Sequence, residues 1–128
     1  MFAKRNLASL IAALAVSAAP ALAGDTLKVG SVFPMSGQQS TYGEESLNGL
    51  ELALSDLKGT DPALAAKITV VKEDEKSNPI DAATAVKKIL NVDKVDVVFG
   101  SVASSNTLSM TAAVLEAGKP LVTPASDR

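Results

Sequence analysis

Apolar residues recur at two spacings along this chain, and the change from one to the other separates strands from helices. Residues 26–33 (TLKVGSVF) are rich in β-formers in loose alternation and stop before Pro34, which predicts a strand. Beyond Thr41, leucines recur at steps of three and four, which predicts an amphipathic helix that ends near Gly59. Thr41 and Glu44 have the spacing of a capping box at its start. The leucines predicted to face a sheet are Leu47, Leu50, Leu54 and Leu57.

The same order of strand and helix then repeats. Residues 67–71 (KITVV) predict a second strand, and Asn78 followed by Pro79 predicts the capped start of a helix. Residues 95–99 (VDVVF) predict a buried third strand, and a helix is expected over about residues 105–117. The predicted apolar stripes are Ala82, Val86, Ile89 and Leu90 in the first of these helices, and Leu108, Ala112 and Leu115 in the second.

A fourth strand begins at Leu121, after three repeats of strand and helix. This alternation predicts an α/β fold, in which an open parallel sheet with right-handed crossovers carries helices on both faces. Ligands of such sheets bind at the carboxyl ends of the strands. We therefore expect three loops to meet there, namely residues 34–42, 100–105 and 123–127.

Residues 1–23 have a different character from the rest of the chain. A basic start, an apolar run over residues 7–19 and Ala-Leu-Ala before Gly24 are the three parts of a secretory signal peptide. A membrane anchor is the weaker alternative, because the apolar run is shorter than the roughly 20 residues that a bilayer crossing needs. We expect the mature protein, residues 24–128, to lie outside the cytoplasm.

Several kinds of chemistry lack their residues in this sequence. The chain contains no histidine and no cysteine, which removes His- and Cys-based nucleophilic sites, the usual zinc ligands and disulfides. Neither dinucleotide-binding nor P-loop glycine motifs follow a predicted strand. A net charge of −2 gives no electrostatic footprint for nucleic acid. We therefore expect no catalytic residues, no cofactor and no nucleic-acid partner.

The acidic run of residues 73–75 (EDE) is the one stretch that could suggest a metal site. Three adjacent carboxylates cannot all point inward, and Lys72 and Lys76 flank them. The sequence therefore favours a solvated loop over a metal site.

Small hydroxyl residues at the start of the last predicted helix are the strongest candidates for binding. Ser104 and Ser105 follow the third strand, where the unpaired backbone N–H groups of a helix start can receive a small anion such as a carboxylate. The alternative is that the two serines only cap the helix. Tyr42, the only tyrosine, is either an apolar wall for a ligand or a ring packed on the surface.

Several short motifs in order carry a resemblance to a known family. They are PMSG followed by YG and NG, the Asn-Pro helix start, GSVASS, and TPAS. Together they resemble the N-terminal lobe of periplasmic branched-chain amino acid binding proteins of ABC transporters, the Leu/Ile/Val-binding type. The resemblance covers nearly all of residues 24–128.

This resemblance implies a type I periplasmic-binding-protein lobe, one half of a hinged two-lobed receptor. It implies that the Ser104 hydroxyl donates to the α-carboxylate of an amino acid, with the Ser105 backbone close by, and that Ala125 and Ser126 supply the remaining ligand contacts. Asp127 is an alternative to Ser126 at the last contact. It also implies that Tyr42 lies against the ligand's side chain.

The function implied is that of a monomeric periplasmic receptor. It would bind a branched-chain or related small amino acid or amide and deliver it to the membrane permease of an ABC transporter. The second lobe is absent from this chain, so we expect a fragment of a larger protein. Two alternatives remain open: a ligand-sensing receptor lobe of the same fold, and a secreted α/β enzyme whose catalytic residues lie beyond Arg128.

Overall fold

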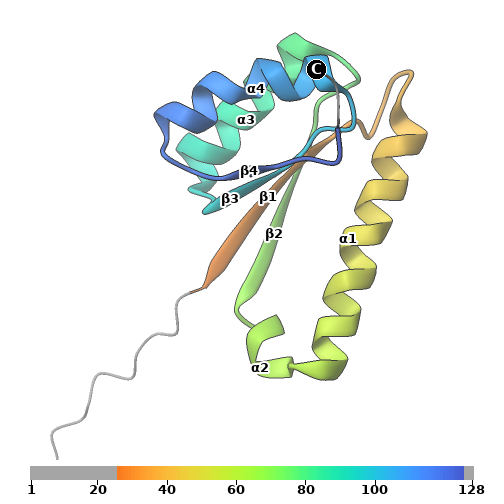
Figure 1. Ribbon diagram of the computed structural model, residues 1–128, viewed down its shortest axis with the longest axis vertical. Coiled ribbons are helices and arrows are strands. Elements are labelled where there is room, and N and C mark those ends of the chain that lie inside the picture. Colours follow the sequence, from red (N-terminus) through yellow and green to blue (C-terminus); the bar gives the residue numbers. More distant parts are fainter. Residues whose placement is uncertain (1–25, 126–128) are drawn as a thin grey trace, which may run out of the picture.

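Four parallel strands form the centre of the computed structural model, which describes residues 26–125 (Figure 1). The predicted signal peptide and Ser126 lie outside these residues. The sheet order is β2-β1-β3-β4, so the chain reverses its direction across the sheet beside β1. The predicted parallel α/β fold is confirmed. The strands are β1 (Leu27–Phe33), β2 (Ile68–Asp74), β3 (Val97–Gly100) and β4 (Leu121–Val122).

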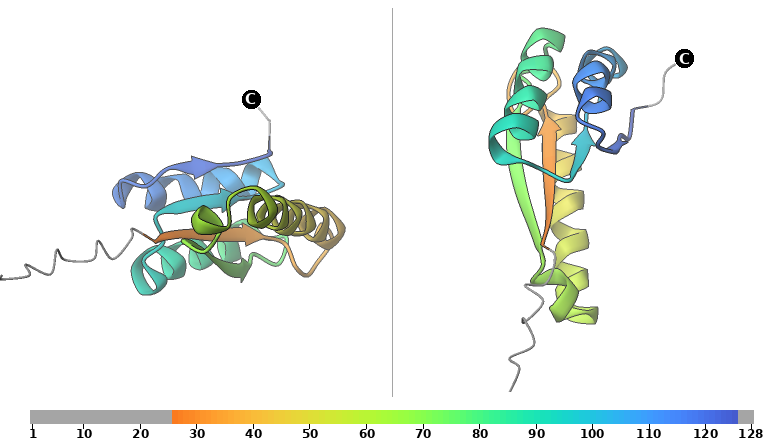
Figure 2. Two further views of the ribbon diagram at one scale, coloured as in Figure 1. Left: turned by 90° about the horizontal axis from the view of Figure 1, so that it is seen from below. Right: turned by 90° about the vertical axis from the view of Figure 1, so that its left-hand side faces the viewer.

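Helices cover both faces of this sheet, as right-handed crossovers in opposite directions require. Helix α1 (Ser40–Thr60) lies on one face, and α3 (Pro79–Lys88) and α4 (Ser104–Glu116) pack side by side on the other (Figure 2). A short helix, α2 (Pro62–Ala65), precedes β2, and a π-helical turn over Ile89–Asp93 follows α3. Within residues 26–125, no helix is both long enough and apolar enough to cross a membrane.

The core lies between the sheet and the pair α3 and α4. It is aliphatic, and it buries all four residues predicted as the apolar stripe of α3 and its π-helical turn. The predicted start of α3 is also confirmed, because the Asn78 side chain accepts a hydrogen bond from the Ile80 N–H and Pro79 is the first helical residue. The buried core cluster is Val32, Ala82, Ala85, Val86, Ile89, Leu90, Val95, Val98, Met110 and Val114.

Helix α1 has the predicted leucine stripe but not the predicted start. The four leucines are half-buried, whereas the Leu52 side chain, on another face, is exposed. The helix begins at Ser40, and no side chain caps it, so the capping box of Thr41 and Glu44 is wrong. The physical reason is that the Gln39 carbonyl already accepts the Gly43 N–H at 3.2 Å, which places Thr41 inside the first turn.

The apolar stripe predicted for α4 is wrong. Leu108 and Leu115 are 72% and 74% exposed, and the buried residues are Asn106, Met110 and Val114. Both sets have helical spacing, so periodicity alone allows either. Because Asn106 is polar, the sequence pattern favoured the other set as the buried face of the helix. It is buried because its side-chain amide donates to the Glu75 carboxylate.

Candidate functional site

A pocket of about 480 Å³ opens beside the carboxyl ends of the strands. Its wall is made by the loop after β1 with the first turns of α1, by the loop after β3, and by the chain just after β4. The predicted meeting of these three loops is therefore confirmed. Among the described residues, the pocket is lined by Gln39, Tyr42, Glu45, Ser46, Val102 and Pro124.

Of the candidate residues that the structure describes, Tyr42 lines this pocket, and the others follow a lining residue closely in the sequence. Tyr42 lines it directly and is 63% exposed, so its ring is not packed into the protein. Ser104 and Ser105 follow the lining residue Val102 at the start of α4. Ala125 follows the lining residue Pro124.

The start of α4 is free of side-chain caps. The residue before the helix is Ala103, and it makes no side-chain cap to the backbone N–H groups of the first turn. The alternative in which Ser104 and Ser105 only cap the helix is therefore wrong. The first backbone N–H groups of a helix have no partners within it and carry a partial positive charge. Among the described residues that line the pocket, none is basic and Glu45 alone is charged.

Two threonines join the chain after β4 to the loop after β3. The Thr123 hydroxyl donates to the Ser101 carbonyl at 2.8 Å and lies 3.3 Å from the Thr107 hydroxyl. Thr123 also accepts the Ala125 N–H at 3.0 Å. These bonds hold the chain that leads to Ala125 against the loop that leads to Ser104. The Ala125 N–H is already used in a hydrogen bond within the protein.

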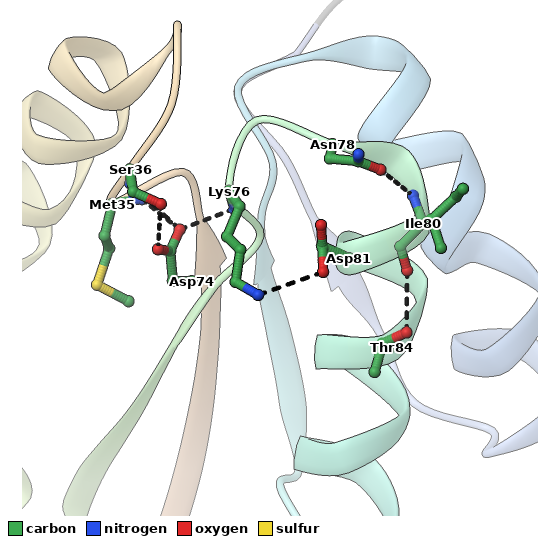
Figure 3. A network of polar contacts seen from close by, with 8 residues as sticks. All are labelled: Met35, Ser36, Asp74, Lys76, Asn78, Ile80, Asp81 and Thr84. Atoms are coloured by element: carbon green, nitrogen blue, oxygen red, sulfur yellow. Dashed lines mark hydrogen bonds and ion pairs between the residues drawn. The ribbon is translucent and has the colours of Figure 1, made fainter.

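Asp74 fixes the loop after β1 (Figure 3). One carboxylate oxygen accepts the Met35 N–H at 2.8 Å, the Ser36 N–H at 3.3 Å and the Lys76 N–H at 2.8 Å. The other accepts the Ser36 hydroxyl at 2.6 Å. The strand β2 thus extends to Asp74, and this carboxylate is not part of a solvated loop as predicted. Its contacts hold the segment that leads to Tyr42.

Acid should loosen this loop. Burial raises the pKa of Asp74, but the hydrogen bonds from the Ser36 side chain and from the Lys76, Met35 and Ser36 N–H groups outweigh it and lower the pKa. A lowered pKa stabilises the fold above the unfolded-state pKa, and this stability is lost as pH falls through the folded-state pKa. The midpoint temperature of thermal unfolding should fall from neutral to acid pH in the wild type. We expect this fall to be smaller in Asp74→Asn. The control Asp56→Asn, at an exposed position of α1, should leave the decline unchanged, and equal pH profiles for Asp74→Asn and wild type would contradict this role.

Glu75 is the residue that the sequence prediction misplaced most. It was expected in a solvated loop, but its side chain is fully buried and accepts hydrogen bonds from Ser101 and Asn106. The described residues contain no cluster of three His, Cys, Asp or Glu that could hold a metal ion. The burial of Glu75 arises because two polar residues of another loop provide its partners, and nothing in the local sequence indicates that pairing.

The other pocket residues that the sequence prediction missed have weak local signals. Glu45 and Ser46 lie one helical turn after Tyr42, so a helix drawn with Tyr42 on the ligand side would have included them. Gln39 and Pro124 belong to loops already predicted to meet, but neither residue type indicates binding by itself.

Comparison with known proteins gives the same family along the whole described chain. Residues 26–128 match the family model described as "Periplasmic binding protein". The chain is 32% identical over 117 residues to the Leu/Ile/Val-binding protein homolog 7 of Brucella abortus (strain 2308). This match covers 91% of this chain and 29% of that protein.

Solved structures agree with this match. The branched-chain amino acid substrate-binding protein LivJ of Streptococcus pneumoniae, in complex with isoleucine, superposes with a TM-score of 0.74 at 30% identity over 80% of this chain and 30% of that one. A solute-binding protein of an ABC transporter from Rhodopseudomonas palustris, in complex with benzoate, has a TM-score of 0.70 at 33% identity over 78% of this chain and 27% of that one. The chain spans under a third of the length of these relatives. The protein therefore belongs to the periplasmic binding protein family.

Proposed function

We propose that this chain is the N-terminal lobe of a periplasmic solute receptor, which holds the carboxylate of a small ligand at the start of α4. Residues 1–23 serve as its signal peptide, and residues 24–128 belong to the lobe. A second lobe closes over the ligand, and the closed monomer delivers a branched-chain or related small amino acid to the permease of an ABC transporter. Hinge closure of this kind excludes water, which strengthens hydrogen bonds to a charged group.

The observation that carries the proposal is an uncapped helix start beside an open pocket without a basic residue in its described lining. Ser104 offers a hydroxyl and Ser105 a backbone N–H to a carboxylate there. Tyr42 forms one wall, against which an apolar side chain can lie. Ala125 and Ser126 are proposed to supply the contacts from the chain after β4.

Two relatives support a carboxylate as the group recognised. LivJ was solved with isoleucine and the Rhodopseudomonas palustris protein with benzoate. These ligands differ in shape and in their amino group, but both carry a carboxylate next to an apolar body. A lobe that holds the shared group leaves selection among ligands to the rest of the cleft.

Calorimetry on the full-length protein tests this function. L-Leucine, L-isoleucine, benzoate and L-leucinamide are titrated separately at millimolar concentration. We expect binding of at least one carboxylate ligand, and no binding of leucinamide, because its neutral amide replaces the group that α4 receives. Equal affinity for leucine and leucinamide would contradict carboxylate recognition, and no heat with any acid would contradict the proposed ligand class.

Ser104→Ala is the direct test of the hydroxyl. The ligand's carboxylate would lose one donor, and we expect binding to weaken by about 1–3 kcal/mol. Ser55→Ala is the matched control, because Ser55 is exposed in α1 and does not line the pocket. Affinity for leucine should be unchanged in the control. Unchanged affinity in Ser104→Ala as well would remove Ser104 from the site.

A further inference from the structure

Glu75, the first residue after β2, lies next to the start of α4, and hydrogen bonds fix its backbone. Its backbone N–H donates to the Phe33 carbonyl at 3.2 Å, and its own carbonyl accepts the Asn78 N–H at 3.0 Å. Its side chain is 0% exposed. The carboxyl group therefore projects from a fixed backbone into the interior.

One oxygen of this carboxyl group joins both ends of a six-residue segment, residues 101–106. Oε1 accepts the Ser101 hydroxyl at 2.5 Å and the Asn106 side-chain amide at 2.7 Å. Ser101 lies in the loop after β3, and Asn106 lies in the first turn of α4. Ser101 Oγ also accepts the Ala103 N–H at 3.3 Å, so the segment folds around the Glu75 carboxyl group.

We propose that Glu75 is the positioning residue of the carboxylate site, because it fixes the segment whose Ser104 and Ser105 groups receive the ligand. This inference rests on the proposed function. Glu75 does not line the pocket, so it acts through the segment and not by contact with the ligand. Glu75 Oε1 accepts hydrogen bonds from both the Ser101 hydroxyl and the Asn106 side-chain amide, so one atom holds both ends of the segment.

The protonation of Glu75 should then change the strength of ligand binding. Oε2 is buried and has no hydrogen-bond partner among the described residues. Burial raises the pKa of Glu75; the hydrogen bonds from Ser101 and Asn106 oppose this rise, and the Asp74 charge adds to it. The folded protein therefore holds this proton more tightly than an ordinary glutamic acid does, and the unpartnered oxygen can carry it.

No cation contacts Glu75 in the part of the chain that the structure describes. Residues 101–103 and the first turn of α4 carry no charged side chain, and the one charged residue of α4, Glu116, lies at its other end. On the side of α3, Lys76 pairs with Asp81 at 3.5 Å, and Lys88 pairs with Glu73. Asp74 is the charged neighbour on β2.

Ionisation of Glu75 consequently places an uncompensated negative charge behind the helix start that receives an anion. Since both charges compete for the positive end of α4, ligand affinity should fall as pH rises through the pKa of Glu75. By linkage, ligand binding favours the protonated acid.

The test measures L-leucine and benzoate binding by calorimetry on the full-length protein between pH 5 and 9. Wild-type affinity should fall with rising pH, by roughly tenfold in all. Glu75→Gln keeps an acceptor for Ser101 and Asn106 but cannot ionise, so it should bind near the wild-type low-pH level with a flat profile. Glu75→Ala should bind about tenfold more weakly at low pH. Glu73→Gln is the control carboxyl group, and it should keep the wild-type profile.

A second measurement, on the protein without added ligand, separates this inference from the proposed function. Hydrogen exchange at three backbone amides reports the order of the segment. The Ser101 N–H donates to the Thr107 hydroxyl, the Ala103 N–H to the Ser101 hydroxyl and the Thr107 N–H to the Ala103 carbonyl. Exchange should accelerate in Glu75→Ala and not in Glu73→Gln. If neither leucine nor benzoate binds the wild type while exchange responds, the proposed function is overturned and the positioning of the segment stands. If ligand binds and Glu75→Gln keeps the wild-type pH profile, or Glu75→Ala changes neither exchange nor affinity, the inference is overturned.

Discussion

Gly100→Ala is expected to destabilise the protein by about 2–6 kcal/mol and to weaken ligand binding with it. Gly100 has φ +143°, a conformation that side chains rarely adopt, and an added Cβ would lie 2.0 Å from the Val32 carbonyl oxygen. The strain and the clash add, because neither is relieved without separating β3 from β1. Since Ser101 follows directly, any shift also moves the segment that leads to Ser104.

Chemical denaturation of the full-length variant measures the loss, and Gly118→Ala separates its two causes. Gly118 also has a positive φ, +64°, but nothing lies within 4 Å of an added Cβ. The control should therefore show the backbone cost alone, about 1–2 kcal/mol. A loss for Gly100→Ala no larger than that of Gly118→Ala would mean that β1 and β3 do not approach as closely as described.

Gly43→Ala is expected to cost about 3 kcal/mol and to weaken ligand binding. Gly43 is the only buried residue of α1, and an added Cβ would lie 1.8 Å from the Pro34 carbonyl oxygen. The first turn of α1 would have to move away from the end of β1. Because Tyr42 is the preceding residue, this movement would displace one wall of the pocket.

The same substitution six residues later in α1 is the control. Gly49 has nothing within 4 Å of an added Cβ, so Gly49→Ala should stabilise the helix by about 0.5–1 kcal/mol and leave binding unchanged. Denaturation midpoints and leucine affinities of the two variants should therefore differ in direction. A stabilised Gly43→Ala variant would contradict the contact between α1 and β1.

The fold could be predicted from the sequence because its signals are local and agree with one another. The strand-like runs, the Asn78 cap with Pro79 and the leucine spacing of α1 each depend on neighbouring residues, and the structure confirms them. The meeting of three loops followed from the order of parallel strands, without any contact being known.

The errors share a different cause, which is pairing between distant polar residues. Asp74 and Glu75 were expected in solvent because three adjacent acids usually are, but one binds the loop after β1 and the other binds Ser101 and Asn106. The buried face of α4 was missed for the same reason. It contains the polar Asn106, which is buried because it forms a hydrogen bond with Glu75. The placement of Ser126 lies outside the described residues, and its role stays a prediction.

The most direct test of the whole account is a crystal structure of the full-length protein with bound L-leucine. The account predicts that the leucine carboxylate lies at the start of α4, with one oxygen about 3 Å from the Ser104 hydroxyl oxygen and the other at a similar distance from the Ser105 backbone nitrogen. Tyr42 should contact the leucine side chain. A carboxylate bound instead to a lysine or arginine, with the start of α4 facing only water, would contradict it.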